Sequence, residues 1–322
     1  MRISFDDIEI ITVGAVRIEQ HTDGIHFYKC TQKQVDAWKS LGNDLYQRSL
    51  TTTGVRLDFY TNSKALDLSV TSGDKFDIYV DGVFRKQYIT DKCGRHIHFD
   101  VSDVLNKTKD NARITIYFPA HSVGVINALE LEDGSDIAPA KHDTKMLFIG
   151  DSITQGWNSG YDSLSYAQRV SRFFNANSII HGVGGGFYHE SIVDSIGFAP
   201  DTVFIAFGMN DFTHYHSEKE LSINVFAFMD RIKEEYKNAK NIFAISPTWR
   251  SDFDTSKSEM KSYDSCRQII IEQINSHGFI HIDGLTLVPP CPEFYADKTL
   301  HPNALGFGIY AENLIKQIIK YI

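Results

Sequence analysis

The chain has 322 residues, 42% of them hydrophobic, and a formal net charge of −9. This length predicts two domains, because single hydrophobic cores stop growing at about 250–300 residues. The acidic charge argues against a nucleic-acid surface, which needs a basic stripe, and no apolar run reaches the ~18 residues of a membrane span. We therefore expect neither nucleic acid nor a membrane as a partner.

The first residues and the cysteines suggest a compartment. Asp6 and Asp7 stand where a signal peptide would be basic and then apolar, so the sequence as it stands predicts a cytoplasmic protein. A secreted protein trimmed of its signal would look the same. The four cysteines lie far apart and show no metal-ligand spacing: Cys30, Cys93, Cys266 and Cys291. We expect buried or idle thiols and no metal.

The first part of the chain alternates short β-rich segments with turn signals. Strands are predicted at residues 54–60, 65–70, 76–80, 83–85, 113–118 and 125–131, and Asp81-Gly82 is typical of a hairpin turn. Period-two alternation with few helical stretches predicts a β-sandwich over residues 1–140. Residues 137–141 are predicted to be a short linker.

The second part, residues 141–322, alternates strands with helices. The predicted strands are 146–149, 178–180, 202–207, 241–245 and 280–282, and the predicted helices are 161–174, 221–236, 258–274 and 305–319. This repetition indicates a parallel sheet covered on both faces, an α/β fold. Ligands of such sheets bind beyond the carboxyl ends of the strands.

The first of these strands ends in Gly150-Asp151-Ser152. A serine there should be exposed on a tight turn, close to the backbone N–H groups of the next helix. Those are the requirements for a nucleophile whose oxyanion is stabilised at once. The same tripeptide also occurs in ordinary turns, so it needs support from other segments.

Three later segments supply that support after other predicted strands. Residues 182–186 are rich in glycine, so their backbone N–H groups can approach a ligand. The alternatives are a flexible loop and a phosphate-binding loop, although the Lys-Ser/Thr pair of a P-loop is absent. Asn210 can donate to a developing negative charge, or it belongs to a simple turn. His301 precedes Pro302, which can start the last helix; most isolated loop histidines are only surface residues.

Taken together, Ser152, Gly185, Asn210 and His301 follow one another as in the SGNH (GDSL-type) hydrolase superfamily, which the chain resembles over roughly residues 142–322. The resemblance implies a flavodoxin-like three-layer α/β/α domain that hydrolyses esters. It also implies that Ser152 is the nucleophile and His301 the general base.

The same resemblance implies an oxyanion hole. Its donors would be the backbone N–H groups of Ser152 and Gly185 and the side chain of Asn210, with Gly184 nearly as defensible as Gly185. Such donors are typically worth ~2.7–4 kcal/mol each in the transition state. No metal or organic cofactor is required.

One position departs from the family pattern. The family usually places its acid three residues before the histidine, where this chain has Lys298, whereas Asp297 lies four before His301. Either Asp297 reaches the ring across this insertion, or a backbone carbonyl orients the ring and leaves a Ser–His dyad; we favour Asp297. Asp151, which adjoins Ser152, is a third candidate for the acid, but the resemblance implies a structural role for it in bracing the loop.

The amino-terminal half carries a second resemblance. Residues 41–46, Leu-Gly-Asn-Asp-Leu-Tyr, are similar to the Gly-x-Asp-Leu-Tyr signature of β-sandwich domains that precede some SGNH hydrolases. The architecture also resembles carbohydrate esterase family two, in which a jelly-roll domain precedes an SGNH deacetylase. The domain either buttresses the rim of the active site, which we favour, or helps to bind a sugar.

The substrate is inferred from side chains expected near the cleft. Trp157 and Trp249 suit stacking on sugar faces or belong to the core, and Arg250 binds an acidic substrate or pairs with Asp252 or Asp254. No long apolar lid segment separates the motifs, which argues against long-chain lipids. We therefore expect a serine esterase that removes short acyl groups, acetyl first, from a carbohydrate or similar polar alcohol.

Two other functions remain open. The same residues would serve a lysophospholipase, a thioesterase or a general short-chain esterase. A catalytically silent carbohydrate-binding protein is the alternative from another class, supported only by the displaced acid. The expected partner is a small-molecule or oligosaccharide ester, and a homo-oligomer is left open.

Overall fold

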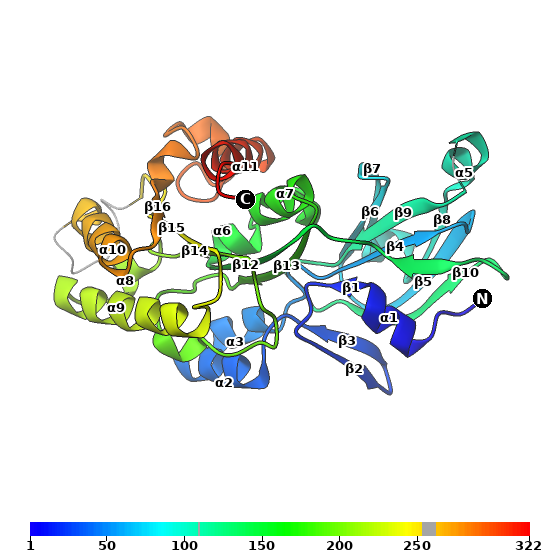
Figure 1. Cartoon of the computed structure of the whole chain (residues 1–322), viewed down its shortest axis with the longest axis horizontal. Helices are drawn as coiled ribbons and strands as arrows, with labels where there is room; N and C mark the ends of the chain where they lie inside the picture. Colours follow the sequence, from blue (N-terminus) through cyan, green and yellow to red (C-terminus); the bar gives the residue numbers. More distant parts are fainter. Residues whose placement is uncertain (109, 253–261) are drawn as a thin grey trace.

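The computed structural model describes residues 1–108, 110–252 and 262–322 and has a mixed α/β fold. Two antiparallel sheets are built from the amino-terminal part, and one parallel sheet with helices is built from the remainder (Figure 1). None of the described helices is long and apolar enough to cross a membrane.

The two antiparallel sheets share one buried core. The first has the order β1 (Thr12–Val13), β4 (Arg56–Thr61), β9 (Ala112–Tyr117), β6 (Lys75–Val80) and β7 (Val83–Ile89), with β11 (Ile137–Pro139) also on β4. The second has the order β2 (Arg17–His21), β3 (Gly24–Tyr28), β10 (Val125–Leu131), β5 (Ala65–Ser72) and β8 (His96–Asp100). Alternate residues of both sheets form the cluster, among them Leu57, Phe59, Ile78 and Ile116 of the first and Phe27, Leu68, Ile126 and Leu129 of the second.

The predicted hairpin is confirmed, and the predicted linker is wrong. Asp81 and Gly82 connect β6 to β7 with φ of 51° and 77°, the positive values that a tight hairpin turn requires at both positions. Residues 137–139, expected to be a linker, form β11 and pair with β4. The two-residue β1 covers only the first part of that edge of β4, and β11 pairs with the part that β1 leaves open.

Helices in the amino-terminal part were not predicted. They are α1 (Phe5–Ile11), α2 (Gln32–Leu41), α3 (Asn43–Ser49), α4 (Thr90–Cys93) and α5 (Ser102–Thr108). A capping box starts α2, because the Thr31 and Gln34 side chains each bond to the other residue's backbone N–H. From α2 and α3, Trp38 and Leu45 pack into the core of the parallel-sheet part. The amino-terminal half thus contributes to both cores.

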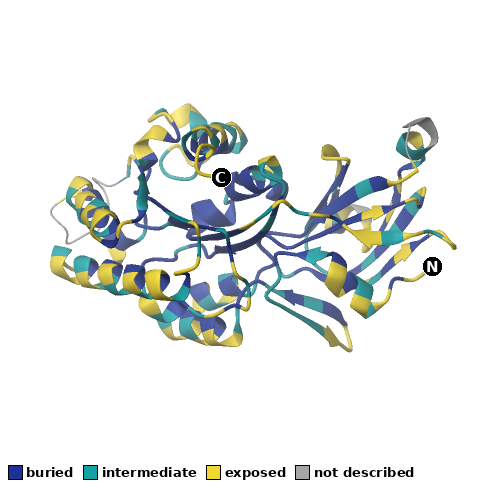
Figure 2. Cartoon of the chain, in the orientation of Figure 1, coloured by how far each residue is buried: buried dark blue, intermediate teal, exposed yellow. Residues whose placement is uncertain are grey.

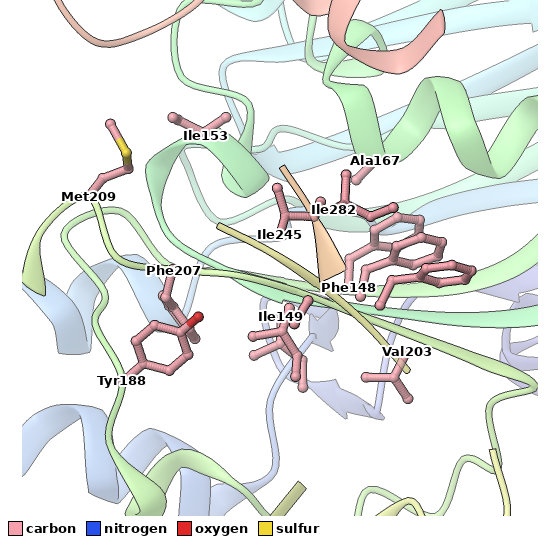
Figure 3. Packing of buried hydrophobic residues seen from close by; sticks show 14 of the residues in the cluster. Phe148, Ile149, Ile153, Ala167, Tyr188, Val203, Phe207, Met209, Ile245 and Ile282 are labelled. Carbon is pink, nitrogen blue, oxygen red and sulfur yellow. The ribbon is translucent and has the colours of Figure 1, made fainter. Parts of the chain in front are cut away.

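The parallel sheet has the strand order β13 (Ala176–Gly182), β12 (Thr144–Gly150), β14 (Thr202–Ala206), β15 (Asn241–Ile245) and β16 (Ile280–Ile282). Phe148 stacks on Phe204 at 4.6 Å between ring centroids, and Phe204 stacks on Phe243 at 5.3 Å. Figure 3 shows Phe148 among the buried residues of this core. Counted along the chain the order is 2-1-3-4-5, so the connections reverse direction between β12 and β14, where ligands of such sheets bind.

Two helix pairs cover the sheet, and their outer faces are exposed (Figure 2). α7 (Tyr166–Phe173) packs with α11 (Ala304–Ile318), and α9 (Glu218–Glu235) packs with α10 (Tyr263–His277). The helix predicted at 161–174 is broken, because Ser165 ends the 3-10 turn η1 (Asp162–Leu164) and caps α7. Of the helix predicted at 258–274, residues 258–261 lie outside the described residues.

Candidate active site

The nucleophile candidate begins a short helix at the carboxyl end of β12. Ser152 is the first residue of α6 (Ser152–Gln155), and Asp151 caps this helix by accepting from the Ile153 N–H at 2.9 Å. A Cβ on Gly150 would lie 2.6 Å from the carbonyl oxygen of Ala206, so only glycine fits there. Ser152 is only 8% exposed, against the expectation of an exposed residue, because its side chain lies against His301.

A row of hydrogen bonds joins three side chains. Oγ of Ser152 lies 2.8 Å from Nε2 of His301, and Nδ1 of His301 lies 2.6 Å from Oδ2 of Asp297. The second contact fixes the ring and favours the tautomer whose Nε2 accepts the serine proton. The arrangement can therefore generate a serine nucleophile.

The loop before His301 accommodates the extra residue. Lys298 adopts a left-handed conformation with φ of 66°. Oδ1 of Asp297 accepts from the backbone N–H groups of Thr299 at 3.0 Å and Leu300 at 2.8 Å. Burial raises the pKa of Asp297, but these bonds and the His301 ring outweigh it and lower that pKa to about 2. The carboxylate beside His301 is therefore ionised at neutral pH.

Backbone N–H groups suited to an oxyanion come from the two segments expected to supply them. Among the described residues, no acceptor takes a hydrogen bond from the N–H of Ser152 or of Gly185. The N–H of Gly184 is already used, since it donates to Oε1 of Gln155 at 2.7 Å. Gly185 has a φ of 81°, which favours glycine. Of the two glycines, Gly185 is the one with an available donor.

Asn210 lies beside the glycine segment. Its Nδ2 donates to the carbonyl oxygen of Gly186 at 2.9 Å, which leaves the second hydrogen of the amide for another acceptor. The next residue, Asp211, accepts from the N–H groups of Tyr188 and Gly208, each at 2.9 Å. These bonds join the loop after β13 to the loop after β14.

Of the three expected substrate-binding residues, Trp157 lies at the site. Its ring centroid is 6.1 Å from that of His301, and its Nε1 donates to Oε1 of Gln155 at 3.1 Å. Trp249 instead packs on Tyr295, with centroids 4.7 Å apart. The Trp157 ring also contacts His121, with centroids 5.2 Å apart, and the Arg48 guanidinium at 5.5 Å. Trp157 therefore lies beside the catalytic candidates but is partly occupied by the protein, and Trp249 is engaged in packing.

Arg250 is occupied by the protein itself. Its side chain is 6% exposed, donates to the carbonyl oxygen of Met209 at 2.7 Å and pairs with Asp252 at 2.6 Å. The alternative partner, Asp254, lies outside the described residues. Because Arg250 follows a strand, the sequence predicted that it lies near the cleft. The sequence did not predict the direction of its side chain, which points into the protein.

A depression next to the oxyanion candidates is shared between the two halves of the chain. It has a volume of about 490 Å³, and Gly185, Phe187 and Asn210 line one side. The other side comes from residues 41–45 and Arg48, so the Gly-x-Asp-Leu-Tyr segment lies at the rim. Arg48 was not predicted, although it lies two residues after that segment, which is the signal that could have indicated it.

A larger cleft lies elsewhere. It measures about 1060 Å³ between β4, β6 and β9 on one side and α7 and α11 on the other, and none of Ser152, Asn210 and His301 lines it. Its arginines join the two halves: Arg56 donates to the carbonyl oxygen of Ala176 at 2.7 Å, and Arg113 donates to Asn175 at 2.9 Å. Chemistry rather than volume therefore identifies the candidate site.

No cluster of three or more histidine, cysteine or acidic side chains suited to a metal occurs in the described part of the chain. Cys30 and Cys266 are buried free thiols and Cys291 is a half-buried one. The side chain of Cys93 lies outside the described residues.

Solved structures of similar fold cover both halves of the chain. A salicylyl-acyltransferase from a tetracycline biosynthetic pathway matches with a TM-score of 0.82 at 17% identity, over 99% of this chain and 97% of that chain. A family two carbohydrate esterase from Cellvibrio japonicus matches with a TM-score of 0.69 at 14% identity, over 100% and 97%. An acetyl xylan esterase from Butyrivibrio proteoclasticus matches with a TM-score of 0.60 at 14% identity, over 84% and 91%. At these identities the similarity establishes the fold.

No curated relative matches the sequence. The GDSL-like lipase/acylhydrolase family, however, matches residues 148–309, half of the chain, including Ser152, Gly185, Asn210 and His301. The chain therefore belongs to the GDSL-like lipase/acylhydrolase family.

Proposed function

We propose that the protein is a serine esterase that removes short acyl groups, acetyl first, from a carbohydrate or similar polar alcohol. The observation that carries the proposal is the hydrogen-bonded row from Asp297 through His301 to Ser152, at the carboxyl end of the parallel sheet. In this proposal Ser152 is the nucleophile, His301 the general base and Asp297 the acid that orients the ring.

The reaction proceeds by two acyl transfers. Oγ of Ser152 attacks the ester carbonyl carbon while its proton moves to Nε2 of His301. The oxyanion accepts hydrogen bonds from the N–H groups of Ser152 and Gly185 and from Nδ2 of Asn210. The carbon–oxygen bond to the alcohol then breaks, and the alcohol leaves with the proton from His301. Water attacks the acyl-enzyme in the same way and releases the acid.

The proposed substrate class is supported by the surroundings of the site. The half-buried Trp157 lies beside His301, where the departing alcohol has to accept its proton, and an aromatic ring there suits contact with a sugar. Several solved structures of the same fold are described as carbohydrate esterases or as an acetyl xylan esterase. Both observations favour a sugar alcohol over the lysophospholipid or thioester of the alternative hydrolases.

Transfer to an alcohol instead of water is a second candidate. The similarity to the salicylyl-acyltransferase extends over nearly the whole of both chains. The same acyl-enzyme serves both reactions, and only the second acceptor differs. The silent carbohydrate-binding alternative loses its only support, since Asp297 contacts His301 despite its displaced position.

We also propose that the chain divides near residue 140. In this division residues 1–140 form a jelly-roll-like sandwich, and residues 141–322 form a flavodoxin-like three-layer catalytic domain. The shared core of the two antiparallel sheets and the 2-1-3-4-5 order of the parallel sheet support it. Helices α2 and α3 belong to the first unit by sequence and pack on the second.

Acetate release from acetylated xylo-oligosaccharides tests the proposal, with p-nitrophenyl acetate assayed in parallel. We expect wild type to release acetate from the sugar and Ser152→Ala to release none. Hydrolysis of the nitrophenyl ester alone would retain the esterase and reject the sugar. A product acylated on an added alcohol, formed in preference to free acid, would favour the acyltransferase.

A further inference from the structure

We infer that the amino-terminal unit sets the geometry of the oxyanion hole, with Lys29 and Arg48 acting as positioning residues for the glycine segment 182–186. The inference rests on the proposed function, since it assigns Gly185 as an oxyanion donor. Beyond supporting the rim of the active site, the amino-terminal unit would act through two side chains that hold specific peptide groups of this segment.

Lys29 connects the two units from inside the protein. Its side chain is completely buried, and Nζ donates to the carbonyl oxygen of Gly182 at 2.8 Å, at the end of β13. The same ammonium lies within hydrogen-bond distance of the carbonyl oxygen of Arg48 at 2.9 Å and of the hydroxyls of Thr51 and Thr53 at 2.8 and 2.9 Å. No carboxylate of the described residues pairs with it. A buried lysine with only neutral acceptors is costly, so its place needs a reason.

Arg48 acts two residues further along the same segment. Its Nη1 donates to the carbonyl oxygen of Gly184 at 2.9 Å, and its guanidinium lies 5.5 Å from the centre of the Trp157 ring. That carbonyl belongs to the peptide group that also contains the N–H of Gly185. Because a peptide group is planar, fixing the oxygen fixes the direction of that N–H.

The same segment is held from the catalytic side by Gln155. Its Oε1 accepts from the N–H of Gly184 at 2.7 Å, while its Nε2 donates to the carbonyl oxygen of Ala120 at 2.8 Å and to Thr51 at 3.3 Å. Thr51 is also a partner of Lys29, so one buried network joins the amino-terminal unit to both sides of Gly184.

Glycines need such fixing more than other residues do. Residues 184–186 carry no side chains that could pack, and Gly185 adopts a φ of 81°, so hydrogen bonds must hold the segment. Lys29 holds the peptide oxygen of Gly182, Gln155 the N–H of Gly184, and Arg48 the oxygen of Gly184. The N–H of Gly185 is left pointing at no protein acceptor among the described residues. An oxyanion hole acts through such preorganised donors.

The test compares Arg48→Met, Arg48→Lys and Lys29→Met with wild type on p-nitrophenyl acetate. Arg48→Met and Lys29→Met should lower kcat by about 10- to 100-fold. A complete oxyanion-hole donor raises kcat by ~10²–10³-fold, and a misplaced donor loses part of that increase. KM should change by less than about threefold, since the oxyanion forms only after binding. Arg48→Lys should recover part of kcat by donating again to Gly184.

The matched control is Arg56→Met. Arg56 is also a buried cation of the amino-terminal unit that bonds β13, but it contacts Ala176 and Ser178 at the start of the strand. Its removal should lower the melting temperature and leave kcat of the folded fraction within about twofold. A second readout is the affinity for phenylboronic acid, which forms a tetrahedral adduct with the serine and should weaken in parallel with kcat.

The outcomes separate this inference from the proposed function. If Ser152→Ala keeps activity in the same assay, the proposed function fails and this inference fails with it. If Ser152→Ala is inactive but folded Arg48→Met has wild-type kcat and boronate affinity, the positioning inference alone is wrong. A rise in KM with unchanged kcat would overturn it in favour of a substrate-binding Arg48. If Lys29→Met does not fold, Arg48→Met decides, because its side chain is one-third exposed.

Discussion

Oδ2 of Asp297 lies 2.6 Å from Nδ1 of His301, although four positions rather than three separate the two residues. The left-handed conformation of Lys298 absorbs the additional residue, and the backbone N–H groups that follow bond to Oδ1 of the same carboxylate. The loop is therefore built around the carboxylate, which contacts both the chain and the imidazole.

Asp297→Asn should lower kcat by up to ~10⁴-fold, by analogy with the loss of the acid in serine-protease triads. The oxygen of the Asn side chain can still accept the hydrogen bonds from the backbone of the loop. Towards His301, however, the side chain presents either an NH2 group, which favours the wrong tautomer of the ring, or an uncharged oxygen, which is a weaker acceptor. Steady-state kinetics with p-nitrophenyl acetate measure the effect, and a melting curve controls for the fold. A loss of only a few-fold in a folded variant would mean that the acid is dispensable and that Ser152 and His301 act as a dyad.

Lys298 offers a test of the loop that leaves the three side chains intact. A β-branched residue is strained at a φ of 66°, whereas glycine is not. Lys298→Val should therefore lower the free energy of unfolding by about 1–3 kcal/mol and reduce kcat, while Lys298→Gly should preserve kcat. Urea unfolding and kinetics on the pair measure both effects. Equal kcat in the two variants would show that the loop conformation does not position Asp297.

Two buried carboxylates behind the nucleophile predict a pH-dependent stability. Burial raises the pKa of Asp151 and of Asp211 to about 7 each. Between pH ~4 and ~7 these two groups hold protons in the folded protein that they have already released in the unfolded chain, so their contribution to the free energy of unfolding falls as the pH rises. Burial lowers the pKa of His121, His142 and His181 to about 4 each, and these groups contribute with the opposite sign, so a variant has to be compared with wild type. Asp151→Asn should remove the contribution of Asp151, so its free energy of unfolding should fall less, or rise more, between these pH values than that of wild type.

Urea unfolding near pH ~5 and ~7 measures the dependence. Asp230→Asn serves as the control, because Asp230 is exposed on α9 and its replacement should leave the dependence as in wild type. An Asp151→Asn variant whose free energy of unfolding changes between the two pH values by the same amount as that of wild type would contradict the raised pKa of Asp151.

Trp38→Ala tests whether α2 is part of the core of the parallel-sheet half. Trp38 is 3% exposed, and it packs from α2 into the core of the parallel-sheet half. Removing a buried tryptophan typically costs ~3–5 kcal/mol, and we expect a loss of that size with a single unfolding transition. Tyr60→Ala, at a position 38% exposed, should cost much less. A loss below about 1 kcal/mol for Trp38→Ala would mean that α2 is not part of that core.

The candidate catalytic residues could be located from sequence because of the topology of a parallel sheet. Ser152, Gly185 and Asn210 each follow a strand, and strand ends of one direction meet at one edge. Lys29 and Arg48 could not be found in this way. They contact Gly182 and Gly184 across sequence separations of 153 and 136 residues, and no local pattern records such a contact.

The fold was predicted best where periodicity is strong. β5 alternates clearly, and the strands of the parallel sheet are short apolar runs. α2 was not predicted although Thr31 and Gln34 carry a capping signal, because most of its residues are polar and few apolar positions mark its helical period. The pairing of residues 137–139 depends on an open edge of β4, which is a tertiary property.

Identification of the acylated residue tests the central claim most directly. The protein is mixed with p-nitrophenyl acetate, quenched in acid during turnover, digested and examined by mass spectrometry. The account predicts an acetyl group on the peptide that contains Ser152, and none on that peptide in Ser152→Ala, which should also be inactive. An acetyl group that accumulates on another residue at the rate of turnover, or full hydrolysis by Ser152→Ala, would contradict it.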